Sequence, residues 1–106
     1  MNSPNESAIV RKILKYLNAL PDCVARKRWS GGMGLAGDPD ITGCIHGRHL
    51  EFEVKRLGQQ PTILQTGRLE EWRQAGAVVA VVSSVEEVRR ILASEGLLEA
   101  EVPEKS

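Results

Sequence analysis

One short turn constrains the fold of this chain more than any other feature. His46-Gly47 separates two segments with strand-like sequences, residues 41–45 and 48–55. Two-residue connections commonly join antiparallel strands, and glycine readily adopts the positive φ that such a turn requires. The sequence therefore predicts a tight β-hairpin with strands over 41–45 and 48–55.

The turn also sets the register of the hairpin. Ile45 pairs with Arg48, and counting outward from this pair places Asp40 opposite Glu53. Directly opposed residues have Cβ atoms about 4.5–5.5 Å apart, and like charges at that separation are destabilising. At about 5 Å and an effective dielectric constant near 20, the repulsion is on the order of 3 kcal/mol. A hard divalent cation between the carboxylates would turn this penalty into a binding site, and Mg²⁺ is typically held by one or two carboxylates.

The second hairpin strand has one apolar and one charged face. Side chains alternate along a strand, which separates Leu50, Phe52 and Val54 from Glu51, Glu53 and Lys55. An alternative to a metal site is a solvated charged face on which Lys55 neutralises one carboxylate.

The order of the charged residues resembles a known nuclease signature. Asp40, preceded by Pro39, and then Glu53 and Lys55 at the end of the next strand resemble the PD-(D/E)XK nucleases. With Gln65 downstream, the pattern more narrowly resembles the VRR-NUC branch of that superfamily. The ordered set, with its hairpin register and a following helix, is more specific than an isolated D…ExK pattern.

The resemblance extends over most of the chain, from residue 3 to residue 92, and segment 76–84 is similar to the end of VRR-NUC domains. It implies an α/β fold of the order αβββαβ(α), in which helices flank a mixed central sheet. We accordingly predict one nuclease-like domain over residues 1–95 and a C-terminal tail over 96–106.

The resemblance implies a metal centre at the open end of the hairpin. Asp40 and Glu53 would hold Mg²⁺, for which Mn²⁺ would substitute, with help from the backbone carbonyl of Val54. Glu6 matches a further acidic residue that this branch often carries in its first helix. The residues alone leave a second role open for Glu6, because Ser3 and Glu6 have the spacing of a helix-capping box.

Two further residues have catalytic roles by the same resemblance. Lys55 would orient or deprotonate the attacking water, or stabilise negative charge on the phosphate. Gln65 would align the site from the following helix. Taken without the resemblance, Gln65 is an ordinary exposed glutamine of a helix.

Hydrophobic spacing predicts the remaining elements. Apolar residues at helical intervals indicate a helix over 4–20, and helices are also expected over 61–75 and from residue 85. A strand is expected over 23–29. Residues 77–82 are apolar throughout, which indicates a central strand covered on both faces.

The charge balance argues for local contacts with nucleic acid. The 14 basic and 14 acidic residues give a formal net charge of zero, so no overall positive field attracts DNA. The candidate contact residues are Arg26, Lys27, Arg28, Ser30 and Arg56. The alternative is an edge strand with solvated basic side chains.

Other classes of site are less well supported. The glycine-rich segment 30–37 lacks the ending of a phosphate-binding loop, so no nucleotide cofactor is expected. Cys44, His46 and His49 suggest a zinc site, but their spacing matches no standard finger and a fourth ligand is missing. Cys23 and Cys44 are expected to be reduced thiols.

The resemblance implies a metal-dependent DNA endonuclease that hydrolyses phosphodiester bonds. The preferred substrate is branched or Holliday-junction DNA, cut by a homodimer, and the compact format resembles stand-alone phage proteins. With no membrane segment or signal peptide in the sequence, we expect a cytoplasmic protein of a bacterial host or phage. The alternatives are a flap nuclease of other polarity, a catalytically inactive nucleic-acid-binding module, and a module whose acidic face binds a basic protein.

Overall fold

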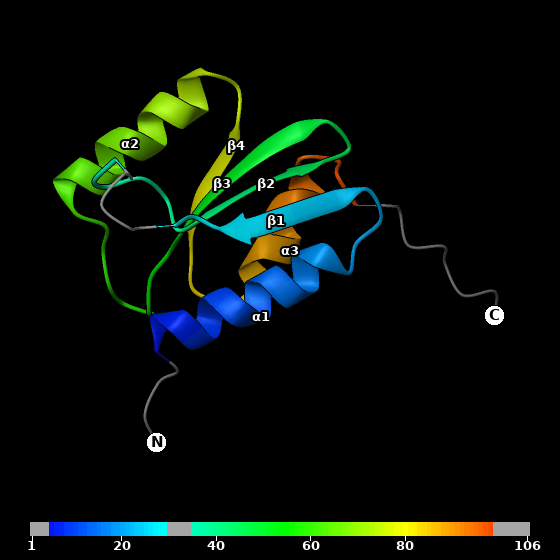
Figure 1. Cartoon of the computed structure of the whole chain (residues 1–106), viewed down its shortest axis with the longest axis horizontal. Coiled ribbons are helices and arrows are strands. Elements are labelled where there is room, and N and C mark those ends of the chain that lie inside the picture. The colour runs from blue at the N-terminus through cyan, green and yellow to red at the C-terminus, as the bar shows by residue number, and fades with distance from the viewer. Residues whose placement is uncertain (1–4, 30–34, 99–106) are drawn as a thin grey trace.

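A mixed four-stranded sheet forms the centre of the structure, a computed structural model that describes residues 5–29 and 35–98. Along the chain the elements are α1 (Glu6–Asn18), β1 (Cys23–Lys27), β2 (Ile41–Ile45), β3 (Arg48–Val54), α2 (Ile63–Gln74), β4 (Val78–Val82) and α3 (Val85–Ser94). The strand order is β1-β2-β3-β4 (Figure 1). The first two strand pairs are antiparallel and β3 pairs with β4 in parallel. The predicted fold class is confirmed.

The predicted hairpin and its register are confirmed. His46 has a φ of 48° and Gly47 a φ of 82°, and positive values at both central residues are typical of the type I′ turn that matches strand twist. Ile45 pairs with Arg48 across this turn, and the ladder runs out to Ile41 opposite Phe52.

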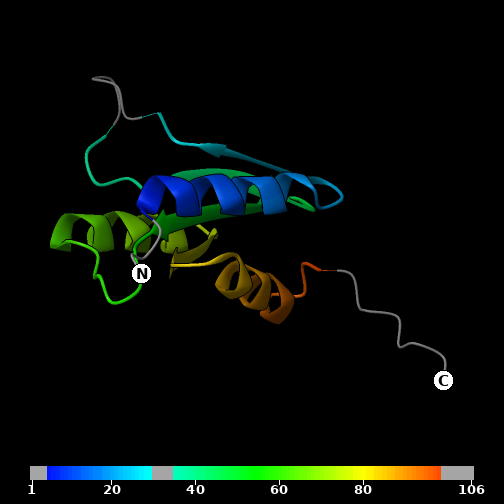
Figure 2. The ribbon, with the colours of Figure 1, turned by 90° about the horizontal axis from the view of Figure 1, so that it is seen from below.

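Helices α1 and α3 cover one face of the sheet and enclose the apolar core. Figure 2 shows α1 lying lengthwise along the sheet, with α3 beside it. The core side chains come from both helices and from alternate positions of the strands: Ile9, Val10, Ile13, Leu17, Ile41, Ile45, Leu50, Phe52, Val54, Val78, Val82, Val88 and Leu92. Leu97 also belongs to this core, so packing continues beyond the predicted domain end at residue 95.

The start of α1 differs from the prediction. Asn5 is the N-cap, and its Oδ1 accepts a hydrogen bond of 2.8 Å from the amide of Ala8. Glu6 is therefore the first residue of the helix, whereas the glutamate of a capping box is the third. The predicted Ser3–Glu6 capping box is wrong for this reason, although Ser3 itself lies outside the described residues.

Helix α2 lies on the opposite face, over β3 and β4, and its inner side meets a polar loop. A Cβ at position 37 would lie 2.7 Å from Cγ of Leu64, and Gly37 has a φ of +86°, so only glycine suits this place. One and two turns further along the helix, Arg68 donates to the carbonyl of Ala36 and Trp72 donates to Asp38. Three residues on one side of α2 thus fix the segment that leads to Asp40.

Strand β4 is an edge strand and not the central strand that its sequence predicts. Within the described sheet it pairs only with β3. Its apolar sequence fits the contacts with α2 on one face and α3 on the other, although Val81 stays 37% exposed. Helices on both faces do not require a neighbouring strand on each side. In the part of the chain that the structure describes, no helix has the length and apolar character needed to span a membrane.

Candidate active site

The two carboxylates of the predicted site lie at the open end of the β2–β3 hairpin, where one further step of the register beyond Ile41 and Phe52 places Asp40 opposite Glu53. The backbone of Asp40 extends the ladder of β1, because its carbonyl accepts from the amide of Arg28 at 2.7 Å. Its Oδ2 accepts a hydrogen bond of 2.8 Å from the amide of Val54. Strand alternation directs Glu53 to the α2 side of the sheet, away from the core face that contains Phe52.

Glu53 is a buried carboxylate with an incomplete set of partners. Its exposed fraction is 2%, and its Oε1 has no hydrogen-bond partner in the described structure. Its Oε2 lies 3.5 Å from Nζ of Lys55. The pKa of Glu53 is raised from 4.5 to about 7, mainly by burial and also by the negative charges of Asp40 and Glu6, against a partial opposing effect of Lys55.

An unpartnered oxygen of this kind fits a cation site. A buried polar atom without a partner destabilises the fold by about 1–3 kcal/mol, and by more if it is charged. Mg²⁺ prefers carboxylate oxygens and satisfies its remaining positions with water and phosphate oxygens. Asp40 and Glu53 therefore suit Mg²⁺ or Mn²⁺ chemically.

The further ligands suggested by the sequence are less closely assembled. Across residues 5–29 and 35–98, no three His, Cys, Asp or Glu side chains converge as a ready metal cage. Glu6 is half-buried and influences the pKa of Glu53 electrostatically, without completing such a group. The amide of Val54 is bound to Asp40, and the role of its carbonyl stays a prediction.

Gln65 caps the start of α2, a structural role separate from the predicted catalytic one. Its Oε1 accepts from the amide of Thr62 at 2.9 Å, and its own amide donates to the Thr62 hydroxyl at 3.1 Å. These two bonds form a capping box at the start of α2. The Thr62-x-x-Gln65 spacing is the usual sequence sign of this motif.

The predicted nucleic-acid contacts divide into free and engaged residues. Lys27 and Arg56 are exposed, and Arg26 is exposed while donating to the carbonyl of Ala25. Arg28 instead turns inward. Ser30 lies outside the described residues.

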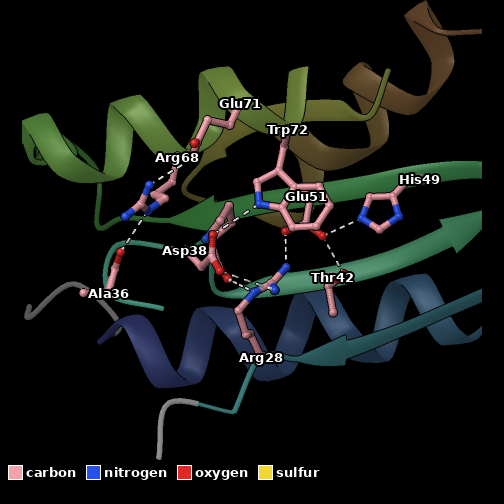
Figure 3. Close-up of polar contacts among 10 residues, drawn as sticks. Arg28, Ala36, Asp38, Thr42, His49, Glu51, Arg68, Glu71 and Trp72 are labelled. Atoms are coloured by element: carbon pink, nitrogen blue, oxygen red, sulfur yellow. Dashed lines mark hydrogen bonds and ion pairs between the residues drawn. The ribbon is translucent and has the colours of Figure 1, made fainter. Parts of the chain in front are cut away.

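A second buried glutamate, Glu51, is fully partnered and was not assigned a role from the sequence. Its exposed fraction is 0%, and it accepts from Arg28, from the Thr42 hydroxyl at 2.5 Å and pairs with Nε2 of His49 at 2.6 Å. The ring of Trp72 stacks on His49 with centroids 4.9 Å apart (Figure 3). The same strand face thus carries two different carboxylates. Glu51 has partners on both oxygens, whereas Oε1 of Glu53, two residues on, has none among the described residues.

The zinc interpretation gains no support. His49 is engaged with Glu51, and Nδ1 of His46 lies 3.7 Å from the carboxylate of Asp22. Cys44 is exposed and Cys23 is buried, and both are free thiols.

Comparison with solved structures connects this fold to a family. No protein-family model matches the sequence, and no curated protein matches it. A structure described as "VRR_NUC domain" superimposes with a TM-score of 0.69 and 27% sequence identity, covering 83% of this chain and 94% of that one. Another, described as "VRR_NUC domain protein", gives a TM-score of 0.71 at 19% identity, covering 87% of this chain and 88% of the other. Over most of both chains, this chain therefore shares the fold of the VRR-NUC domain structures.

Proposed function

We propose that this protein is a metal-dependent nuclease that hydrolyses phosphodiester bonds in DNA. The observation that carries the proposal is the buried Glu53, whose Oε1 is unpartnered opposite Asp40 and beside Lys55. The similarity to VRR_NUC domain structures supports a nuclease.

Asp40 and Glu53 would hold the metal ion. When bound, Mg²⁺ or Mn²⁺ polarises the phosphate and lowers the pKa of a coordinated water. Asp40 is prepared for this by the Val54 amide, which fixes one of its oxygens. Glu53 must release its proton before it can serve as a ligand, because metal ligands bind in their deprotonated form.

Lys55 provides the positive charge of the site. Its side chain is 14% exposed and lies 3.5 Å from Glu53, so its ammonium group is only partly screened by water. From this place it would orient the attacking water or stabilise charge on the phosphate. Phosphoryl transfer depends mainly on such positioning and electrostatic stabilisation.

The substrate we propose is branched DNA, with a four-way junction as the preferred form. The exposed Arg26, Lys27 and Arg56 would contact its phosphates. A homodimer would present two sites about a two-fold axis, which suits a symmetric branched substrate. The net charge of zero is compatible with this arrangement, since two local basic surfaces act together.

A cleavage panel tests the proposal. Four-way junction, flap, single-stranded and duplex DNA are each incubated with the wild-type protein in Mg²⁺, in Mn²⁺ and in EDTA. We expect metal-dependent cleavage with the junction cut fastest. Faster cleavage of the flap would replace the proposed substrate, and binding without cleavage of any DNA would indicate an inactive binding module.

Gln65 offers a smaller, separable effect. Gln65→Ala removes the acceptor for the Thr62 amide and should lower the free energy of unfolding by about 1 kcal/mol. Gln65→Glu keeps a capping acceptor and should restore stability, which urea unfolding measures. We expect cleavage to be slower than wild type in both variants, because neither alanine nor a carboxylate can replace the amide donor of Gln65. Full activity in this variant would show that Gln65 serves only as a cap.

A further inference from the structure

Arg28 contacts the three residues that directly precede β2, namely Asp38, Pro39 and Asp40. Its Nε donates to the carbonyl of Pro39 at 2.9 Å, and its Nη1 lies 3.9 Å from the carboxylate of Asp38. Its backbone amide donates to the carbonyl of Asp40 at 2.7 Å. One residue therefore binds the chain before and after Pro39. Figure 3 shows the Arg28 guanidinium between Asp38 and Glu51.

Glu51 fixes the guanidinium of Arg28. The two side chains are hydrogen-bonded and form an ion pair. Glu51 is itself immobilised, since it is fully buried and its second oxygen is bound by Thr42 and His49. Because both partners are largely withdrawn from water, the geometry of the pair is well defined.

Trp72 closes the arrangement from α2. Its ring centroid lies 5.3 Å from Cζ of Arg28, and its Nε1 donates to Asp38 at 3.3 Å. The guanidinium is thus enclosed by an aromatic ring, a carboxylate and a backbone carbonyl. The planar group of arginine can satisfy these partners together, which the single ammonium of lysine cannot do.

We propose that Arg28, held by Glu51, is a positioning residue that sets the carboxylate of Asp40 for metal binding. The path is short: Glu51 orients Arg28, Arg28 fixes the carbonyls of Pro39 and Asp40, and the Asp40 side chain then meets the amide of Val54. Neither Arg28 nor Glu51 needs to touch the substrate. The inference rests on the proposed function, since it concerns a ligand of the proposed metal.

The test replaces both members of the pair, because removing Arg28 alone would leave a buried charge unpaired and endanger folding. In Arg28→Met/Glu51→Gln the shapes are nearly kept, but the bond to the Pro39 carbonyl is lost. The control is Arg48→Met/Glu95→Gln, which makes the same substitutions in an exposed ion pair of 3.2 Å between β3 and the end of α3.

The first readout is hydrogen exchange of the Val54 amide by NMR, without metal. We expect its protection to fall about tenfold in Arg28→Met/Glu51→Gln, while the amides of Leu50 and Phe52 in the same strand keep theirs. A general loss of stability would expose all three amides together, so uniform loss would overturn the proposal. Unchanged protection of Val54 would overturn it as well.

The second readout is the affinity for Mn²⁺ and the rate of DNA cleavage. Calorimetric titration with Mn²⁺ should give a Kd raised about tenfold, and kcat for junction DNA should fall about tenfold with little change in KM. The control pair should match the wild type in both. Wild-type Kd and kcat in a folded Arg28→Met/Glu51→Gln variant would overturn the inference. If the wild type bound no Mn²⁺, the proposed function would fail, and the Val54 exchange would still decide the role of Arg28.

Discussion

Replacing Glu53 by glutamine should abolish cleavage and at the same time make the metal-free protein more stable at pH 8. The wild-type carboxylate is ionised at that pH although burial and Asp40 raise its pKa from 4.5 to about 7. Each unit of such a shift corresponds to about 1.4 kcal/mol. Removing the charge should therefore raise the free energy of unfolding by about 3 kcal/mol, while the loss of a metal ligand lowers kcat about a thousandfold.

Urea unfolding in EDTA at pH 8 and cleavage of junction DNA in Mg²⁺ measure the two effects. Gain of stability together with loss of activity is expected where a fold retains strain for function. A Glu53→Gln variant that is both less stable without metal and fully active would contradict the proposed site.

Glu51→Gln is the matched control, since it makes the same substitution on the same strand face two residues away. Glu51 has partners on both oxygens, from Arg28, Thr42 and His49. Losing its charge should destabilise the protein by about 2 kcal/mol, because the hydrogen bonds are weakened and Arg28 loses its ion pair. Glu53→Gln should thus raise the free energy of unfolding and Glu51→Gln should lower it. Burial alone cannot produce this difference, since both glutamates are buried.

The opposed carboxylates of the candidate site could be predicted from the sequence because their determinants are local. His46-Gly47 specifies the turn, the turn specifies the register, and the register places Asp40 opposite Glu53. The α2 capping box is equally local, since the Thr62-x-x-Gln65 spacing signals it, but no capping role was predicted for Gln65.

The surroundings of the site could not be predicted in the same way. The bond between Arg28 and Glu51 joins the residue after β1 to a residue of β3, and Trp72 of α2 lies over the same guanidinium. Alternation showed that Glu51 shared a face with Glu53, but it could not show that this face was covered. The edge position of β4 escaped prediction for a similar reason, because hydrophobicity reports covered faces and not neighbouring strands.

The second large effect is a dependence of metal-free stability on pH. The folded protein binds a proton at Glu53 up to about pH 7, whereas the ordinary pKa of the group is 4.5. Between these values the folded state binds more protons than the unfolded state, so stability falls as the pH rises. We expect a loss of about 3 kcal/mol, most of it between about pH 5 and pH 8.

Mg²⁺ should reverse this loss. As the pH rises toward 7, the affinity for Mg²⁺ should increase by up to about tenfold per pH unit, because binding requires the deprotonated carboxylate. At about 100 times its Kd, a ligand of the folded state adds about 2.7 kcal/mol. Urea unfolding at pH 5, 6, 7 and 8, each in EDTA and in Mg²⁺, measures both trends.

The same series in Glu53→Gln assigns the effect to one residue. Other groups with displaced pKa values titrate outside this range: hydrogen bonding to Arg89 lowers the pKa of Glu86 below 4.5, and burial raises the pKa of Cys23 above 9.0 and that of Tyr16 above 10.0. The decline between pH 5 and pH 8 and its reversal by Mg²⁺ should therefore both disappear in Glu53→Gln. A decline that persists in this variant would place the titrating group elsewhere and remove the electrostatic basis of the proposed metal site.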